Sequence, residues 1–390
     1  MKKNNTVGKS VRTKKEANGK LTVGIDLGDR SSRYCILDEQ GEPVVEGSMA
    51  TTKKGFAQVF GSKPRSRVAL EVGTHSPWVS RYLADLGHEV IVANARRVRL
   101  ITESSRKDDR LDAKTLARLA RIDPQLLSPI RHRSEQAQAD LIVIRARAAL
   151  VEARTMLINS ARGLTKSYGE RLRSCGTGQV GEALAETLSE PLQKALKPML
   201  TEIEALSERI REYDQQIEQI AKERYPETEL LRQVHGVRSC GTGQVGEALA
   251  ETLSEPLQKA LGTLTALTYV LTLEDPHRFR RSRDAGAYFG LRPRRRESGN
   301  SRPQLRINKE GDAYVRKLLV QCAHHILGPF GPDSDLRRWG LELAKGGKNA
   351  KKRALVAVAR KLAVLLHKLW VSGEVYEPLR AGKNSKTVAA

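Results

Sequence analysis

The chain has 390 residues, of which 68 are Lys or Arg and 45 are Asp or Glu, so its formal charge at pH 7 is +23. A positive surplus of this size is typical of proteins that bind the phosphate backbone of nucleic acids. The 39% share of hydrophobic residues excludes wholesale disorder. No apolar run is long enough to cross a bilayer, so we expect no membrane partner.

The first 20 residues carry seven Lys or Arg and lack the central apolar stretch of a signal peptide. We expect residues 1–20 to form a disordered basic arm. The four cysteines of the chain form neither a CxxC pair nor a disulfide-like framework. A reduced cytoplasm is therefore the simplest expected location.

Residues 21 to about 94 are predicted to form an α/β unit. Short runs rich in Val, Ile and Leu alternate there with turns such as residues 38–41. A helical stretch near residues 77–86 is followed by a further predicted strand over residues 88–94.

Two acidic residues interrupt predicted strands of this unit. Asp26 lies in the apolar run 23–28, and Glu71 lies in the run 68–72. Because side chains alternate along a strand, Asp26 is on the face opposite Ile25 and points either at a cleft or, as an edge-strand acid, at water. Water is the simpler alternative for Asp26 alone. Glu71 also interrupts an apolar run. A buried carboxylate is costly unless it is paired or bound to a cation.

Two further acids, Asp109 and Asp112, are three positions apart and share one face of a predicted helix. Acids are also favoured at a helix N-terminus by the macrodipole, and for this pair alone that explanation is at least as strong. Together, the four acids form an oxygen-only ligand set that suits hard cations such as Mg²⁺. Two such ions about 4 Å apart bind the attacking and leaving oxygens in phosphodiester cleavage. We therefore predict a Mg²⁺ site formed by Asp26, Glu71, Asp109 and Asp112.

The pattern becomes helical and basic from about residue 134, within a middle region predicted over residues 131–230. After Pro198, apolar residues recur alternately four and three positions apart, which is the heptad pattern of a coiled coil. Two alternatives stay open, an antiparallel hairpin with the preceding helix of the same chain and a seam between two chains of a dimer. The predicted seam consists of Met199, Ile203, Leu206, Ile210, Tyr213, Ile217 and Ile220.

The chain also contains an internal repeat. Residues 173–196 recur without a change as residues 238–261. Two perfect copies indicate a recent duplication, because structural repeats diverge and a solenoid needs at least about three units. Each copy contains the pattern G-x-G-x-x-G, but no apolar strand precedes the first copy. We interpret the pattern as a Gly-rich loop that leads into a helix.

The last region, residues 231–372, is expected to form a mainly helical C-terminal domain that holds the second copy as an insert. It ends in a long basic amphipathic helix at about residues 349–369. Residues 373–390 are expected to be a disordered tail.

Several of these segments resemble a known family. The motifs Gly24-Ile25-Asp26, Leu70-Glu71-Val72-Gly73-Thr74 and Lys107-x-Asp109-x-x-Asp112-Ala113 are similar to the RuvC-like half of the DEDD transposases of bacterial insertion sequences, the bridge-RNA-guided serine recombinases. Residues 287–301 and 306–316 resemble that family's C-terminal transposase domain in order and spacing. The resemblance covers most of residues 21–369. It implies a RuvC-like, RNase H-like α/β domain over residues 21–130, a helical coiled-coil region and a mainly α C-terminal domain.

The resemblance assigns the family's serine nucleophile to Ser298. From the residues alone, Ser, Gly and Asn together favour a turn, and no histidine stands beside Ser298 in the sequence to activate its hydroxyl. We expect metal-bound acids to supply the activation. Guanidinium groups grip phosphate oxygens by paired hydrogen bonds, and several crowd this segment. The expected nucleic-acid contacts are Arg294, Arg295, Arg296, Arg302, Arg306 and Lys309.

The resemblance further implies a recombinase that forms a covalent phosphoserine link to DNA. A structured RNA encoded by the element would select target and donor DNA by base pairing. In the family, one active site takes its two parts from different protomers, so a homodimer or homotetramer is expected. DNA at the element ends and at the target would be the substrate, and the protein would associate with the bacterial nucleoid.

Two other functions stay open. A structure-selective nuclease would use the same four acids with water as the nucleophile and would leave no protein on DNA. A non-catalytic nucleic-acid-binding relic would tolerate the duplication. The second copy separates residues 233–237 from residues 262–267, which together resemble a phosphate-binding helical hairpin.

Overall fold

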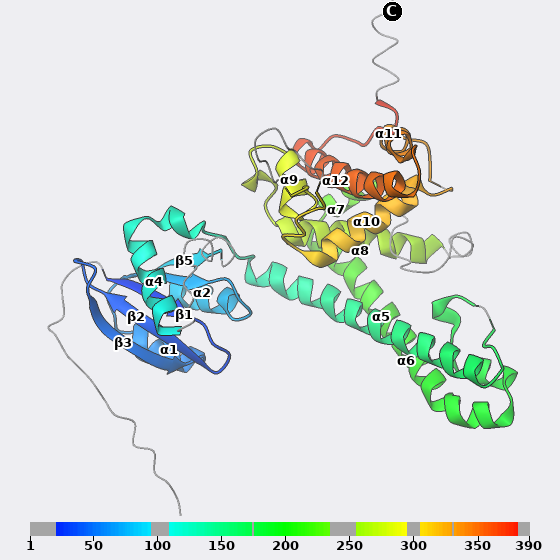
Figure 1. The fold of residues 1–390 in the computed structure, drawn as a ribbon, viewed down its shortest axis with the longest axis horizontal. Helices are drawn as coiled ribbons and strands as arrows, with labels where there is room; N and C mark the ends of the chain where they lie inside the picture. Colours follow the sequence, from blue (N-terminus) through cyan, green and yellow to red (C-terminus); the bar gives the residue numbers. More distant parts are fainter. Residues whose placement is uncertain are drawn as a thin grey trace, which may run out of the picture. The chain divides into compact units, whose positions relative to one another are not determined.

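The computed structural model describes residues 21–94, 109–173, 175–234, 255–294, 305–329 and 331–380. The chain divides into two units, residues 1–133 and residues 134–390 (Figure 1). The first unit holds the sheet, and the second is helical. Four residues of the predicted sites lie outside the described residues, namely Arg295, Arg296, Ser298 and Arg302.

The first unit is built on a five-stranded sheet in the order β3-β2-β1-β4-β5. The strands span Thr22–Asp26 (β1), Ser31–Leu37 (β2), Pro43–Ala50 (β3), Arg67–Glu71 (β4) and Glu89–Ala93 (β5). β1, β4 and β5 run parallel, whereas β2 is antiparallel to both β1 and β3. A mixed sheet of this kind is consistent with the predicted α/β, RNase H-like domain.

Helices cover both faces of the sheet. They span Lys53–Phe60 (α1), Ser76–Asp85 (α2) and Asp109–Ile122 (α4), followed by the 3-10 turn Pro124–Leu127 (η1). α1 and α2 bury Phe56 and Val79 in a cluster with Ile25 of β1. α4 covers the other face, where Ala113 and Ala117 pack beside residues of β2. Successive apolar residues of a strand point to opposite faces of the sheet, so the sheet has a separate core on each face.

α4 crosses β1 at Gly24, where the two backbones approach closely. A Cβ atom added to Gly24 would lie 2.6 Å from the backbone nitrogen of Ala117 and closer still to the carbonyl oxygen of Ala113. At the other end of the helix, Arg67 donates from Nη1 to the carbonyl oxygen of Ala120, at 3.3 Å. Because Arg67 begins β4, α4 runs antiparallel to β1 and β4. Its first turn therefore lies at the carboxyl ends of these two strands.

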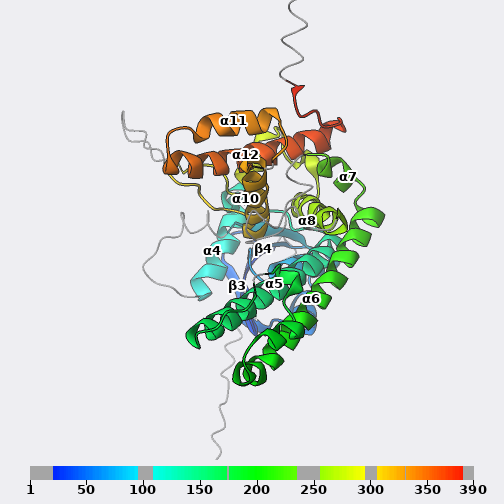
Figure 2. The same ribbon diagram turned by 90° about the vertical axis from the view of Figure 1, so that its right-hand side faces the viewer.

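The second unit begins with two long helices that pack side by side (Figures 1 and 2). They span Glu135–Ser167 (α5) and Glu190–Arg224 (α6). Arg147 contacts Asp214, and Arg154 donates to the Oγ of Ser207 at 3.1 Å, so the helices are antiparallel. The hairpin alternative is thus what the chain forms, whereas a coiled coil between two chains stays a prediction.

The buried seam of α6 differs in part from the predicted one. Ile203, Ile210 and Ile217 are buried as expected. Between them, however, the seam uses Ser207 and Asp214, and the apolar residues one position earlier are only half-buried. The reason is that two arginines of α5 enter the contact and need oxygen partners there. The hydrophobic pattern alone therefore places the seam at Leu206 and Tyr213, one residue before the buried Ser207 and Asp214.

The first repeat copy forms the connection between α5 and α6 and the first turns of α6. It contains the 3-10 turns Thr177–Gln179 (η2) and Glu182–Thr187 (η3), and its Val180, Leu188 and Leu192 pack against Ile158 of α5. Residues 238–254 of the second copy lie outside the described residues. The shared letters EPLQKAL begin α6 at Glu190 and begin another helix at Glu255. The same seven residues are therefore helical in both contexts.

In the part of the second unit that the structure describes, six helices and a 3-10 turn follow α6. They span Glu227–Arg232 (α7), Glu255–Leu273 (α8), Pro276–Arg278 (η5), Arg283–Tyr288 (α9), Ala313–Leu327 (α10), Asp335–Ala344 (α11) and Lys348–Ser372 (α12). α8 is buried on all sides from residue 262 to residue 273, which is typical of a central core helix. Its Tyr269 donates a hydrogen bond to the carbonyl oxygen of Ala363 on α12, at 2.6 Å. Figure 2 shows α10 crossing beneath α11 and α12.

Part of the expected disordered tail follows an ordered path. The amide nitrogen of Asp335 donates to the carbonyl oxygen of Pro378 at 2.8 Å, and that of Tyr376 donates to Gln233 at 3.2 Å. Tyr376 also packs against the hydrophobic core, and burying an aromatic ring offsets the entropy lost in ordering the segment. Of the helices in the described ranges, none is long and apolar enough to cross a membrane.

Candidate active site

Asp26 and Glu71 end two adjacent parallel strands. The register pairs Ile25 of β1 with Leu70 of β4, so the next residue of each strand lies at the same edge of the sheet. Ile25 and Leu70 both face the core under α1 and α2. Asp26 and Glu71, one position on, therefore stand on the opposite face, which α4 covers. Both acids are half-buried.

The first turn of α4 reaches the same edge. Asp109 is the first residue of the helix, and Asp112 is an exposed residue of its first turn. Ala113 packs on Gly24, two residues before Asp26, so the chain preceding Ala113 continues toward the strand end. The side chain of Asp109 lies outside the described residues. Three elements thus bring the segments of all four predicted acids to one edge.

The donor chemistry of this edge fits a hard divalent cation. Adjacent strands are about 4.8 Å apart, so two ionised carboxylates at neighbouring strand ends repel each other unless a cation or a proton intervenes. Their oxygens are the ligands that Mg²⁺ and Ca²⁺ prefer. Among the side chains that the structure describes, no group of three or more His, Cys, Asp or Glu is close enough to hold a metal ion. The described geometry therefore supplies a pair of carboxylates and not a complete cage.

Sequence reasoning missed a histidine that joins the loops after β1 and β4. The Nε2 of His75 lies 3.2 Å from the Oδ1 of Asp29, and its Nδ1 accepts a hydrogen bond from the indole of Trp78 at 3.1 Å. Because Nδ1 accepts, the proton of the neutral ring is on Nε2 and is donated to Asp29. The contact fixes both loops next to Asp26 and Glu71. His75 stands four residues after the end of β4, and the local sequence pattern does not mark it as a partner of the loop after β1.

A second missed contact holds the loop after β4. Ser76 is buried, accepts a hydrogen bond from the amide of Gly73 at 2.9 Å, and lies 2.9 Å from the Nε2 of His132 through the same Oγ. Burial, with the nearby charges of Arg81 and Arg133, lowers the pKa of His132. The lowered pKa favours the neutral form of the His132 ring. The serine before a helix-starting proline was a signal for a helix N-terminus rather than for this contact.

A narrow two-stranded ribbon carries the segment that includes Ser298. Pro293 and Ile307 form an antiparallel bridge, and the amide nitrogen of Arg294 donates to the carbonyl oxygen of Arg306 at 3.0 Å. Residues 295–304, which lie outside the described residues, are thus joined at both ends to paired backbone. Two of the predicted phosphate-binding arginines, Arg294 and Arg306, face each other across this ribbon by register.

An ion pair links the end of this segment to α5. Asp312 caps α10 by accepting from the amides of Tyr314 and Val315, and Arg145 of α5 donates to its Oδ2 at 2.5 Å. Burial opposes ionisation of Asp312, but the bonds from Arg145 and the two amides outweigh burial and lower the pKa of this carboxyl. Arg145 also lies over the ring of Tyr314, 4.8 Å from its centroid. The start of α10 is therefore fixed to the hairpin.

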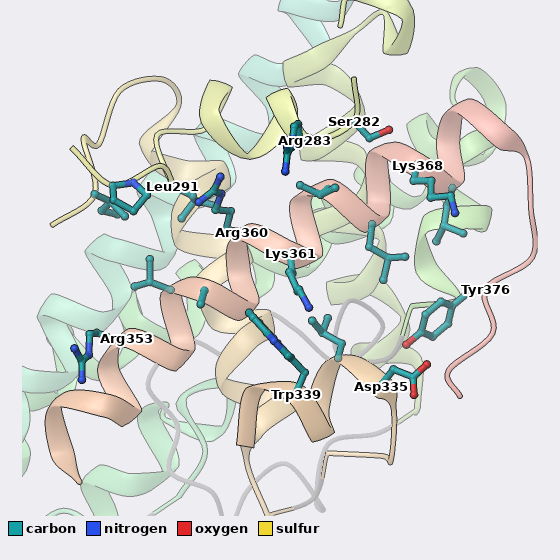
Figure 3. A pocket seen from close by; sticks show the side chains of 18 of the residues that line it. Ser282, Arg283, Leu291, Asp335, Trp339, Arg353, Arg360, Lys361, Lys368 and Tyr376 are labelled. Carbon is teal, nitrogen blue, oxygen red and sulfur yellow. The ribbon is translucent and has the colours of Figure 1, made fainter. Parts of the chain in front are cut away.

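A groove of about 1570 Å³ lies along α12 and beside the ribbon (Figure 3). Arg306 and Lys309, both predicted nucleic-acid contacts, line it together with residues of α9, α11 and α12. Nine of its described lining residues are Lys or Arg, and three are Asp or Glu. The groove is hence positively charged and adjoins the serine segment. Arg294 is not among its lining residues.

Transposase family models match segments in both units of the chain. A DEDD transposase family model matches residues 23–169, and a model described as transposase IS116/IS110/IS902 family matches residues 258–335. The first match spans the sheet unit and continues through α5. The second includes the ribbon and α10.

Three curated relatives are transposases as well. The chain is 26% identical to the transposase for insertion sequence element IS1111A of Coxiella burnetii, over 91% of this chain and 90% of that protein. It is 27% identical to a probable family 20 transposase of Pseudomonas aeruginosa, over 91% and 98%. It is also 27% identical to the transposase for insertion sequence element IS1328 of Yersinia enterocolitica, over 77% and 82%. All three alignments extend across both units.

Proposed function

Because the chain belongs to the DEDD transposases of insertion sequences, we propose that it cuts and rejoins DNA by a metal-assisted serine recombinase reaction. The observation that carries the proposal is the placement of Asp26 and Glu71 side by side, on the face and at the edge where α4 begins. Carboxylates grouped in this way are suited to phosphodiester chemistry.

DEDD transposases typically use divalent metal ions, and we propose Mg²⁺ here. Asp26, Glu71, Asp109 and Asp112 would hold it. When bound, the cation would offset the negative charge that develops on the scissile phosphate. The Asp29–His75 contact joins the loops that follow the two acid-bearing strands, and we assign it a positioning role rather than a role in holding the cation.

Ser298 is the proposed nucleophile. Its Oγ attacks the phosphorus, a serine–phosphate bond forms, and the bond from phosphorus to one sugar oxygen breaks. The proton of the serine hydroxyl leaves, and the departing sugar oxygen takes up a proton to become a hydroxyl. Because the phosphodiester is replaced by another phosphate ester, a DNA hydroxyl can later reverse the step without ATP. Arg294 and Arg306, at the ends of the serine segment, would grip phosphate oxygens.

The partners in this proposal are the DNA of the element ends and of the target. An element-encoded RNA would choose these sites by base pairing, while the basic surfaces bind backbone. Asp26 and Ser298 belong to different units of the chain. A homodimer or homotetramer would then allow the acids of one protomer to serve the serine of another.

The proposal is tested by looking for a covalent adduct on a denaturing gel. The full chain is incubated with Mg²⁺, DNA spanning the element ends and target, and RNA transcribed from the flanking sequence. We expect a protein–DNA band that is absent from the Ser298→Ala and Asp26→Asn proteins. Cleavage without an adduct, retained by Ser298→Ala, would refute the serine mechanism and favour a nuclease that uses water.

A further inference from the structure

The groove along α12 has a regular alternation of charged and aliphatic side chains. On the row of positions spaced four apart, Lys352, Arg360 and Lys368 alternate with Val356 and Val364. The neighbouring row repeats the order, with Arg353 and Lys361 separated by Ala357 and followed by Leu365 and Leu369. Both rows line the groove, so cations recur about every two turns with apolar surface between them.

Aromatic side chains stand on the wall opposite α12. Trp339 of α11 is half-buried and lies under Lys361, whose Nζ is 3.6 Å from the ring centroid. Tyr376 of the ordered tail lines the same groove (Figure 3). One face of Trp339 carries Lys361, and both rings pack partly against the core, so the aromatic surface that lines the groove stands directly beside its cations. Stacking platforms flanked by cations are the usual means by which proteins hold unpaired nucleic-acid strands.

The stem of Arg360 is held in place by the close approach of α9. A Cβ atom added to Gly286 would lie 3.0 Å from the Cγ of Arg360 and 3.6 Å from a methyl group of Val364. Figure 3 shows Arg283 of α9 near Arg360 of α12, and both residues line the groove. Guanidinium groups from α9 and α12 therefore meet near the middle of α12, and the ammonium groups of Lys352 and Lys368 line the groove on either side.

We propose that this groove binds an unpaired polynucleotide strand, with phosphates on the cations and bases against the aromatic and aliphatic surface. A duplex would present phosphates, sugars and base edges to it, but the faces of its bases are stacked inside. The apolar lining would then stay unused. The proposal rests on the proposed function, since it gives a transposase a site for a single strand next to its serine segment.

The groove is long enough for a short strand. From Lys352 to Lys368, α12 rises about 24 Å at about 1.5 Å per residue. A stacked strand advances about 3.4 Å per nucleotide, so about seven nucleotides span this distance. A guide RNA loop and a displaced DNA strand both have the chemistry required. The groove would contact the features that they share, namely phosphates and unpaired bases.

Binding is tested by fluorescence anisotropy with labelled eight-nucleotide oligo(dT) and oligo(rU), and with a duplex of equal length. The full-length Asp26→Asn protein is used, so that no cleavage interferes. We expect at least one single strand to bind on the order of tenfold more tightly than the duplex. Preference for oligo(rU) would identify RNA as the source, and preference for oligo(dT) would identify DNA. Duplex binding that Lys352→Glu weakens as much as it weakens single-strand binding would overturn the proposal.

Matched variants locate the site. Lys352→Glu should weaken single-strand binding about tenfold and lower the slope of log K against log salt by about one or more. Lys351→Glu changes an exposed neighbour outside the groove lining and should leave binding within about twofold. Equal losses in the two variants would mean that only the overall charge matters, and the groove proposal would fail.

The role of stacking is tested with Trp339→Leu. This variant should lose about tenfold in single-strand affinity, and the strand should quench tryptophan emission in the parent but less in the variant. Thermal unfolding monitors whether the variant is folded, and Lys352→Glu provides the second test if it is not. If the covalent adduct forms normally but these variants bind strands like the parent, the groove proposal falls and the proposed function stands.

Discussion

Gly24→Ala is the substitution that most directly tests how the fold positions the acids. The added Cβ would lie 2.6 Å from the nitrogen of Ala117, whereas ordinary contact begins at 3.4 Å, so α4 must retreat by at least 0.8 Å. The nearby carbonyl of Ala113 demands more. A shift of about 1 Å at a reacting group can lower a rate on the order of 100-fold. The first turn of α4, with Asp112, would move away from Asp26 by this amount.

The matched control is Gly73→Ala. Gly73 lies two residues after Glu71 at the same edge, and a Cβ atom added there meets nothing within 4 Å. DNA cleavage rates and urea unfolding are measured for both proteins. We expect Gly24→Ala to cleave on the order of 100-fold more slowly and to lose about 1–3 kcal/mol of stability, with Gly73→Ala near the parent in both. Cleavage by a folded Gly24→Ala protein at the parent rate would refute the reasoning.

Three other predictions concern the second unit. Asp214→Ala should lower the free energy of unfolding by about 3–5 kcal/mol, because it leaves the buried Arg147 guanidinium without its carboxylate; a urea titration in which it loses under 1 kcal/mol would contradict this. Burial lowers the pKa of His367 from its ordinary value of 6.5, so the unfolded chain takes up the proton first and stability should fall as the pH drops below about 6.5. His367→Gln should flatten that decline in unfolding curves between pH 7.5 and 5.5, and an unchanged slope would show that His367 does not cause it. Deleting residues 238–261 should preserve or restore adduct formation if the second copy is an intrusion, and an inactive deletion beside an active parent would show that the copy is needed.

Periodicity predicted several elements but not the contacts between them. The helix expected near residues 77–86, the strand expected at 88–94 and the final basic helix all lie within a few residues of α2, β5 and α12. The seam of α6 was misplaced at Ser207 and Asp214. Their partners come from α5, more than 50 residues earlier, and hydrophobic patterning within one helix contains no information about them.

The candidate site shows the same division between local and distant information. Asp26 and Glu71 were visible because each interrupts an apolar run. That their strands are neighbours depends on the sheet order, which the sequence pattern leaves open. The contact between Asp29 and His75 follows from that order and was therefore missed. Neither residue departs from its local pattern in a way that would single it out.

The Arg145–Asp312 ion pair connects these local findings. Arg145 lies in the segment matched by the first family model, and Asp312 lies in the segment matched by the second. Asp312 stands four residues after Asn308, whose amide donates to Arg292 in the ribbon at 2.9 Å. The helical hairpin thereby sets where the ribbon begins and, through it, where both ends of the Ser298 segment stand. Under the proposed serine mechanism, a hairpin that fixes this base would restrict the approach of Ser298 to DNA.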